Sequence, residues 1–424
     1  MKKKILLVLS ILIFAFALLV YLSLNSTKAQ FRTCEIIGIS DLEKHDFSQY
    51  DSVLVAANTL YEADWIKEMM QGEQYRDAWA APVQVPIVFL DTLLGGVKVI
   101  EEGGGKQTHS LEVEDSLGVR YTFRSISKDP SKLVPDVARD FGLENIVIDG
   151  VSAQHPYAAL VVAELSKFAG IAHTHPKVYF VPKQKTLDSY NDKYGNRLFL
   201  LEYETEGKVN WTDYENVVEL LDTEDLQQWK SEGKPIDIDH SMLIRARLFD
   251  LIIGDWDRHA KQWGWAVEQK NDSLIAYPIA GDRDNAFFKL EGVIPEIISN
   301  DLLLPEVQTF EHDIENIPGL VRPFDVYFLR STTLAQFKSE ANYLQKALTD
   351  QVIDEAFEVW PKNVFQLDAE EIKQKLKARR LGIFEYAKSF KRILDARDLV
   401  PVILKGSEDL ELDEELSRCF NCQQ

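Results

Sequence analysis

The sequence predicts an α+β fold in which a strand-rich first half precedes a mainly helical second half. Three observations predict it. Short alternating apolar and polar segments occur between residues 95 and 206, apolar residues recur at helical spacing after residue 239, and a long apolar segment precedes both. The chain has 424 residues, 46% hydrophobic and 27% charged, which is enough for two separately packed lobes.

The N-terminal segment, residues 5–24, is uncharged and follows Lys2, Lys3 and Lys4. A membrane span needs about 20 such residues, whereas the apolar part of a signal peptide has about 7–15. Lysines before a span keep that end in the cytoplasm. We therefore expect residues 1–30 to be a membrane anchor or signal segment. The rest is then exported: anchored in the inner membrane and facing the periplasm or the outside, or secreted if the segment is cleaved.

The formal net charge is -21, which argues against nucleic acid as a partner. It does not argue against nucleotide, because a divalent metal can bridge phosphates to carboxylates. Three cysteines are too few for a disulfide scaffold. Cys419 and Cys422 have CxxC spacing but lack the strand-to-helix setting of a redox site and a second pair for zinc. We interpret them as a tail pair open to oxidation outside the cell.

Residues 31–94 form an N-terminal lead-in. Residues 52–56 favour a strand and residues 62–70 a short helix. Residues 81–90 contain Pro82 and Pro86, which indicates an extended segment along the edge of a core.

Residues 95–206 alternate regularly, with a glycine turn at Gly103, Gly104 and Gly105. A helix is expected over residues 154–169, stopped by Gly170, because its apolar residues fall on one face. The five expected strands cover residues 97–100, 110–114, 119–126, 177–181 and 197–204.

Residues 207–405 are mainly helical. Asp239 can cap a helix over residues 240–253, and a hairpin follows over residues 263–279. Later helices are expected near residues 333–348 and 350–359, and a long one capped by Asp368, with Glu371 three residues on, reaches about residue 394. The acidic tail, residues 406–424, is expected to be loosely ordered.

Two loops concentrate carboxylates. Phosphoryl transfer needs a carboxylate to accept the proton of the attacking hydroxyl and a polar side chain five residues later to hold metal, and Asp257 and Gln262 have this spacing. After the hairpin, Asp282 and Asp284 place further acids at a strand end. Helix caps and turns also favour such residues, but two such loops in this order favour a site.

The sequences of these two loops resemble those of known kinase families. The segment Gly-Asp-Trp-Asp-Arg-His at residues 254–259 is similar to the loop of the secretory-pathway kinases (Golgi casein-kinase type), and more loosely to those of HipA-type and phosphoinositide kinases. Residues 282–287 resemble the metal segment of that family. The chain also looks like a group of bacterial exported proteins, some fused to metallophosphatase and outer-membrane barrel modules. The resemblance implies a two-lobed protein-kinase-like fold, with an N-lobe at residues 95–206 and a helical C-lobe at residues 207–405.

The resemblance also implies roles for particular residues. Asp257 would be the catalytic base, His259 would orient it, and Arg258 would pair with Asp282 or a phosphate. Asp282 would bind the metal, with Asp284 and Gln262 as secondary ligands. The glycine turn would cover the phosphates, and residues 200–204, with Glu202 and Tyr203, would bind adenine.

The sequence departs from the family at two places. Arg124 stands where kinases have a nucleotide-binding lysine, and Lys128 is a possible substitute. The helical glutamate that should pair with this cation is missing at its expected place, and Glu164 lies two turns later.

Two functions fit these features best, and a hydrolase or a nucleotidyl-transferring pseudokinase that uses the same acids is a third interpretation. The first is an exported phosphotransferase that uses ATP (or another nucleotide) with Mg²⁺ or Mn²⁺ and acts on a protein or glycan hydroxyl. The second is a catalytically degenerate binding or scaffold module with protein partners in the cell envelope.

Overall fold

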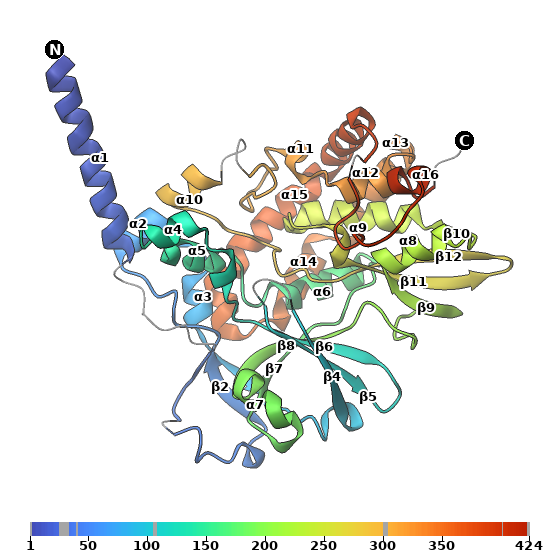
Figure 1. The fold of residues 1–424 in the computed structure, drawn as a ribbon, viewed down its shortest axis with the longest axis horizontal. Helices are drawn as coiled ribbons and strands as arrows, with labels where there is room; N and C mark the ends of the chain where they lie inside the picture. Colours follow the sequence, from blue (N-terminus) through green and yellow to red (C-terminus); the bar gives the residue numbers. More distant parts are fainter. Residues whose placement is uncertain are drawn as a thin grey trace.

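The computed structural model describes residues 2–24, 34–39, 41–104, 108–299, 304–400 and 402–421. Within them the chain forms three β-sheets and a helical part (Figure 1). Helix α1 (Lys2–Leu24) projects away from this body. It and a second, largely buried stretch, Glu144–Phe168, are the two described helical stretches that are long and apolar enough to cross a membrane.

The five-stranded sheet is antiparallel throughout, in the order β4-β5-β6-β8-β7. Its strands are β4 (Val97–Gly103), β5 (Ser110–Asp115), β6 (Arg120–Ser125), β7 (Lys177–Val181) and β8 (Arg197–Tyr203). All five expected strands are present, although β4 continues to the glycine turn. Gly103, Ser110, Arg124 and Leu200 pair in one row across the sheet, so Arg124 shares a sheet face with the glycine turn.

Several short helices, and not one helix alone, connect β6 to β7. The connection contains 3-10 helices at Pro130–Leu133 and Gly150–Ala153 and the helices α4 (Asp136–Asp140), α5 (Glu144–Asp149) and α6 (Ala158–Phe168). Helix α6 begins four residues later than expected, because Pro156 disfavours helical backbone at His155. A 3-10 helix (Lys185–Tyr190) and α7 (Asn191–Tyr194) connect β7 to β8.

Helix α9 (His240–Ile253) has the expected bounds. The Asp239 side chain accepts from the main-chain N–H of Met242, and Gly254 ends the helix at φ 71°. The expected hairpin is also present. It belongs to a four-stranded sheet whose β9 and β10 the sequence analysis missed, in the order β10-β12-β11-β9: β9 (Val217–Asp222), β10 (Ile236–Ile238), β11 (Trp263–Lys270) and β12 (Ser273–Ala280). Helix α8 (Thr223–Ser231) follows β9, and a 3-10 helix (Ala260–Gln262) precedes β11.

The long helix α15 (Lys362–Ala396) corrects one expectation. It begins directly after Pro361, which suits a helix start, so Asp368 lies inside the helix and is not its cap. The Asp368 carboxylate is 3.3 Å from Nε2 of buried His155 instead. The other helices here are α10 (Val293–Ile298), α11 (Ile317–Leu320), α12 (Pro323–Leu329), α13 (Leu334–Ala347) and α14 (Asp350–Ala356), which continues as a 3-10 helix (Phe357–Val359).

The lead-in is part of the folded body. It forms a three-stranded sheet, β1-β2-β3, and two helices, and its Val55 and Trp79 lie in the main hydrophobic core. Buried Asp149 on α5 binds Lys67 on α2 (2.7 Å) and Arg76 on α3. The elements are β1 (Glu35–Ile36), β2 (Ser52–Ala56), β3 (Pro82–Pro86), α2 (Trp65–Gln71), α3 (Arg76–Ala80) and 3-10 helices at Phe47–Gln49 and Leu93–Gly95.

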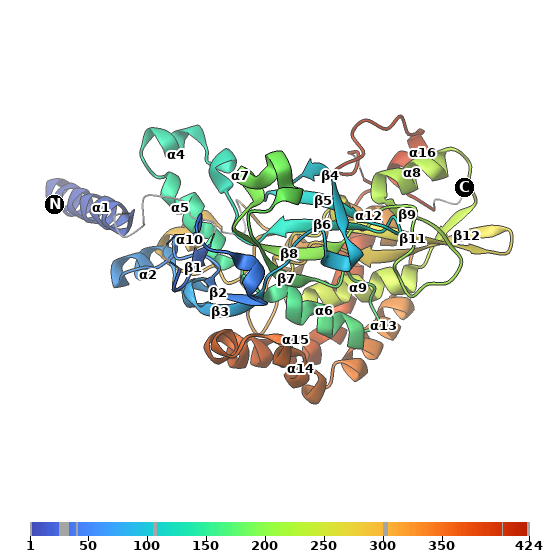
Figure 2. The same cartoon turned by 90° about the horizontal axis from the view of Figure 1, so that it is seen from below.

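The C-terminal tail is packed as far as residue 421, contrary to the expectation of a loosely ordered segment. Leu416 and Phe420 are buried, and α16 (Glu414–Arg418) lies against α8 (Figure 2). The Ser407 hydroxyl donates to the Gln227 side chain at 2.6 Å, which ties the tail to α8 as well. Apolar residues between the acids provide the buried part of this packing, and Ser407 adds a polar contact. Cys422 lies outside the described residues.

Candidate functional site

The loop after α9 is shaped by Gly254 and Asp255. A Cβ on Gly254 would lie 2.5 Å from the Phe310 ring, so both the positive φ and the close packing require glycine. Buried Asp255 accepts from the main-chain N–H of Asp257 at 3.2 Å. Burial raises the pKa of Asp255 well above its ordinary value. This bond fixes the turn that presents Asp257.

Arg258 braces the loop from inside the protein. Its guanidinium is fully buried and donates to the Gln262 side-chain oxygen (2.9 Å), the Gly281 carbonyl (2.8 Å) and the Asp250 carboxylate (3.2 Å). Its contact with Asp282 is to the main-chain oxygen, at 3.4 Å. The expected pairing of Arg258 with the Asp282 carboxylate is therefore absent, and buried Arg258 has no access to a phosphate.

Asp257 is the accessible acid of this loop. Its carboxylate is partly exposed and lies 3.9 Å from Nε2 of His259, too far for a hydrogen bond. Burial lowers the pKa of His259 to about 4, with Asp257 acting in the opposite direction. His259 is thus neutral at pH 7, and the expected hydrogen bond that would orient Asp257 is not formed.

Arg124 joins the sheet to the loop after β12. Its guanidinium lies 2.9 Å from Asp282 Oδ2 and 3.4 Å from Glu202 Oε2. Burial alone would raise the pKa of Asp282, but Arg124 and Lys128 together hold it below its ordinary value. Glu202, on β8, also accepts from the Thr174 hydroxyl at 2.5 Å, and burial raises its pKa.

Lys128 forms the second cation–carboxylate pair of the cluster, with Asp284. The other Asp284 oxygen accepts from the Asn285 amide at 3.1 Å. Burial, and then the charge of Asp282, raises the pKa of Asp284. Glu164 contacts neither cation in the described structure, and its charge acts on His175.

Two small cavities flank Arg124. One, of about 120 Å³, is lined by Arg124, Glu202, Gln262 and Asp282 among others. The other, of about 30 Å³, is lined by Arg124, Lys128 and Asp284 among others. The structure thus brings together Arg124, Lys128, Asp282, Asp284 and Gln262. Asp257 lines neither cavity.

The nucleotide-binding expectations on the sheet have different outcomes. Gly104 has φ 116°, and a Cβ there would lie 2.5 Å from the Thr108 carbonyl, so the turn requires glycine. Gly105 lies outside the described residues. Tyr203 lines the larger cavity, but its ring also stacks on Trp211 with centroids 4.7 Å apart. Glu202 points to Arg124.

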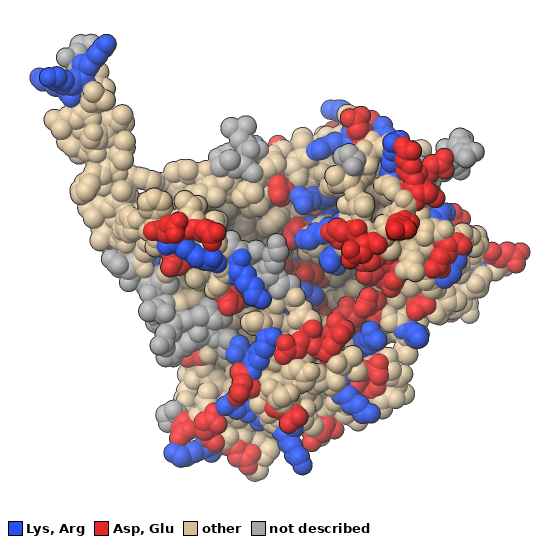
Figure 3. Space-filling view, viewed as in Figure 1, with Lys and Arg blue, Asp and Glu red and all other residues tan. Residues whose placement is uncertain are grey.

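Sequence reasoning missed an acidic surface near the group formed by Arg124, Asp282 and their neighbours. Figure 3 shows acidic side chains in a band between the five-stranded and four-stranded sheets. Among the described residues, Glu206, Asp222 and Asp225 place ligand atoms within 4.8 Å of one another. Burial and the neighbouring acids raise the pKa of Glu206 to about 7. No sequence spacing indicates this cluster, because a strand pairing brings it together.

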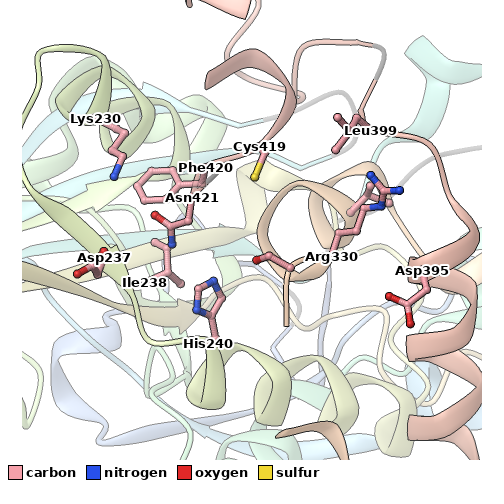
Figure 4. Close-up of a pocket in the computed structure, with 12 residues that line it drawn as sticks. Lys230, Asp237, Ile238, His240, Arg330, Asp395, Leu399, Cys419, Phe420 and Asn421 are labelled. Carbon is pink, nitrogen blue, oxygen red and sulfur yellow. The ribbon is translucent and has the colours of Figure 1, made fainter. Parts of the chain in front are cut away.

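A much larger cavity lies elsewhere in the described structure. It has a volume of about 1010 Å³ and is lined by residues of α8, β10, α9, α12, α15 and the tail, including Lys230, His240, Arg330 and Cys419 (Figure 4). Lys230 is engaged, since it donates to the Ile236 carbonyl at 3.0 Å. This cavity shares no lining residue with the two cavities at Arg124.

Among solved structures, two that resemble this chain do so at low sequence identity. No family model and no curated protein matches the chain. The structure is similar to the Helicobacter pylori proinflammatory kinase CtkA, with a TM-score of 0.32 and 13% identity, over 72% of this chain and 98% of CtkA. It is also similar to HipA of Shewanella oneidensis MR-1, from a toxin–antitoxin complex with HipB and operator DNA. There the TM-score is 0.28 and the identity 13%, over 55% of this chain and 57% of HipA.

Proposed function

We propose that the chain is a kinase-like phosphotransferase with two lobes, the five-stranded sheet forming one of them. The observation that carries this proposal is that Arg124 of β6, Gln262 of the loop after α9 and Asp282 of the loop after β12 line one cavity. Strand cation, loop amide and metal-binding carboxylate are the parts that phosphoryl transfer combines. Here they come from three separate segments of the chain.

Each group has a role in the proposed transfer. The acceptor hydroxyl oxygen attacks the terminal phosphorus of the nucleotide, the bond from phosphorus to the bridging oxygen breaks, and the nucleoside diphosphate leaves. Asp257, the accessible acid, accepts the hydroxyl proton. Arg124 and Lys128 supply positive charge to the phosphates from the sheet side. Arg258 holds the loop in position from below.

The residues present fit a hard divalent cation at one position. Asp282 Oδ1 is buried and has no hydrogen-bond partner in the described structure, and carboxylate oxygens are the ligands that Mg²⁺ and Mn²⁺ prefer. Asp284 offers a second carboxylate beside it. The Gln262 side-chain oxygen accepts from Arg258 at 2.9 Å, and an amide oxygen has a second lone pair with which it would serve as the secondary ligand. When bound, such a cation would neutralise phosphate charge.

Helix α1 supports a location of the proposed activity at a membrane. Its mean hydropathy is 3.1, none of the window is buried in the body, and its lysines lie at the far tip (Figure 3). We infer that α1 is the anchor and that the body faces the periplasm or the outside. The acceptor would then be a hydroxyl of an exported protein or a glycan.

A second candidate, a kinase-like binding module without transfer, is favoured by one observation. Arg124 is held by Glu202 on β8 as well as by Asp282, and no helix carboxylate reaches it in the described structure. A nucleotide phosphate must compete with both carboxylates for this cation.

Thermal unfolding of the full-length chain in detergent tests the proposal. A nucleotide at 100 times its Kd should stabilise the native state by about 2.7 kcal/mol. We expect this shift to need Mg²⁺ or Mn²⁺ and to disappear in Asp282→Asn. Asp257→Asn should keep the shift and lose transfer to the acceptor, because it changes the base alone.

The matched control is Asp272→Asn, in the exposed turn between β11 and β12. It should behave as the wild type. A wild-type protein that no nucleotide stabilises, with either metal, would contradict the nucleotide site altogether. A metal-dependent shift without any transfer would favour the binding module.

A further inference from the structure

Three short helices surround the root of α1. The Tyr21 hydroxyl donates to the main-chain oxygen of Phe141, directly after α4, at 2.9 Å. The Gln71 amide on α2 donates to the Ser23 hydroxyl at 3.0 Å. The start of α10 packs closely against the end of α2 at Gly72 and Gly292. A Cβ on Gly72 would lie 2.3 Å from the Glu291 carbonyl oxygen. Figures 1 and 2 both show α2, α4 and α10 beside the base of α1.

These helices expose large apolar side chains at that place. We call the set the α1 root face; it comprises Trp65 and Met69 of α2, Val137 of α4, Phe141 after it, and Val293, Ile297 and Ile298 of α10. The exposed fractions of Trp65, Phe141 and Ile297 are 69%, 61% and 57%. Surface groups of large apolar residues of this kind mark interaction sites in soluble proteins.

We propose that the α1 root face lies against the surface of the bilayer that α1 spans. The inference rests on the proposed anchor role of α1 and goes beyond it, because it assigns a second, peripheral contact to the folded body. A spanning helix leaves the hydrocarbon at its end, and the root face begins at that end of α1. Continuity with the span therefore selects lipid as the occupant.

The side chains also fit the chemistry of the interface. Tyrosine and tryptophan concentrate at the level of the lipid headgroups, and Tyr21 and Trp65 are exposed here. Glu68 and Glu296 are exposed next to Met69 and Ile297 in the same short helices, and charged side chains so close to the apolar ones favour headgroup depth over hydrocarbon. The net charge of the chain, -21, disfavours attraction to anionic lipid, so the proposed contact relies on the apolar side chains and needs no anionic headgroup.

Fluorescence quenching by brominated lipid tests this contact. All eight tryptophans are described, and only Trp65 is exposed. The full-length chain is reconstituted in phosphatidylcholine nanodiscs with bromine near the headgroup end of the acyl chains. We expect quenching of the wild type and loss of most of that quenching in Trp65→Phe.

Two further variants in the Trp65→Phe background separate the face from the rest of the surface. Ile297→Trp should restore quenching, because it lies on the α1 root face. Leu117→Trp is the matched control: Leu117 is 77% exposed, in the turn between β5 and β6, on the sheet that Figure 1 places away from α1. It should remain unquenched. Each variant must keep the unfolding midpoint of its parent.

The outcomes distinguish this inference from the anchor itself. A chain that fails to co-purify with nanodiscs overturns the anchor, and the root-face contact with it. A chain that co-purifies through α1 but shows no quenching at positions 65 and 297 overturns the root-face contact alone. Protection of Trp65 from aqueous iodide without quenching by bromolipid also overturns it, since a second copy or another protein would then cover the face. Nucleotide-dependent stabilisation is read separately and is unaffected by these results.

Discussion

Two carboxylates near Arg258 are both paired with arginines, but solvent reaches only one of them. Asp250, on α9, is completely buried and binds Arg247 (2.8 Å), Arg258 (3.2 Å) and Arg283 (3.0 Å). Asp282, on the loop after β12, has 27% of its side chain exposed, and one of its oxygens has no hydrogen-bond partner among the described residues.

The difference distinguishes a carboxylate that stabilises the fold from one that a ligand can reach. Burial would raise the pKa of Asp250, yet its three arginines hold it below the ordinary value. Nothing can replace these partners without unfolding the helix packing. Asp282 lines a cavity and shares Arg124 with Glu202, so a ligand can compete for its contacts. The first cluster therefore braces the site, and the second is the part that can bind.

Removing the buried charge should have the largest effect. In Asp250→Asn three guanidinium groups lose a shared anion inside the protein, which should reduce the free energy of unfolding by about 3–5 kcal/mol. Asp282→Asn should reduce the free energy of unfolding by less than half as much. Water can reach Arg124 and solvate the charge that loses its partner. Chemical denaturation of both full-length variants measures the two losses. Equal losses would mean that the Asp282 pair is as structural as the Asp250 network.

The Arg124 side of the comparison is tested by binding. Arg124→Met should retain most of the stability of the unliganded protein but lose the nucleotide-dependent gain, about 2.7 kcal/mol at 100 times Kd in the wild type. Thermal unfolding with and without nucleotide and metal measures this. Lys132→Met, on the neighbouring exposed turn, is the control and should keep the gain. An undiminished gain in Arg124→Met would remove Arg124 from the proposed site.

The sequence predicted the local parts of this comparison and not the long-range ones. Helix α9, its cap and the loop spacing follow from neighbouring residues, so their bounds were correct. Asp250 carried an unused signal, because it falls on the same helical stripe as Leu243, Ala246 and Ile253, and an acid on an apolar stripe must find buried partners.

The partners of Arg124 could not be predicted in the same way. Glu202 reaches Arg124 only because β6 pairs with β8, with Thr122 opposite Glu202 in the register. Because the expected helix glutamate is missing, the sequence predicts that Arg124 has no carboxylate partner. In the structure, Glu202 of the neighbouring strand β8 supplies that carboxylate. The buried tail was missed for a related reason, since Leu416 and Phe420 are few among acids and their contacts are distant in sequence.

The pH dependence of stability sharpens the comparison at His259. Its pKa is about 4 in the folded protein, against 6.5 ordinarily, because burial disfavours the charged ring. The unfolded chain therefore binds more protons between pH 4 and 6.5, so stability is complete above pH 6.5 and falls as the pH decreases through this window. Lowering the pH through this window should reduce the free energy of unfolding of the wild type by roughly 1–2 kcal/mol. We expect His259→Gln to abolish this reduction. Unfolding midpoints at pH 5 and pH 7.5 for both proteins measure it, and equal pH slopes would contradict it.

The smallest effect comes from one hydroxyl in each cluster. Ser166 accepts from Arg283 at 2.8 Å in the buried network, and Thr174 donates to Glu202 at 2.5 Å beside the cavity. Ser166→Ala leaves a buried guanidinium N–H without its acceptor and should cost about 1–2 kcal/mol of unfolding free energy. Thr174→Val should cost less than about 1 kcal/mol, because Glu202 keeps Arg124. The larger consequence of Thr174→Val should be a change in nucleotide affinity. Without the Thr174 hydrogen bond, Glu202 is less fixed in position, and its competition with a phosphate for Arg124 changes. If Thr174→Val instead destabilised the protein more than Ser166→Ala and left nucleotide binding unchanged, the cavity side would be the structural cluster, and the roles assigned to the two carboxylates would have to be exchanged.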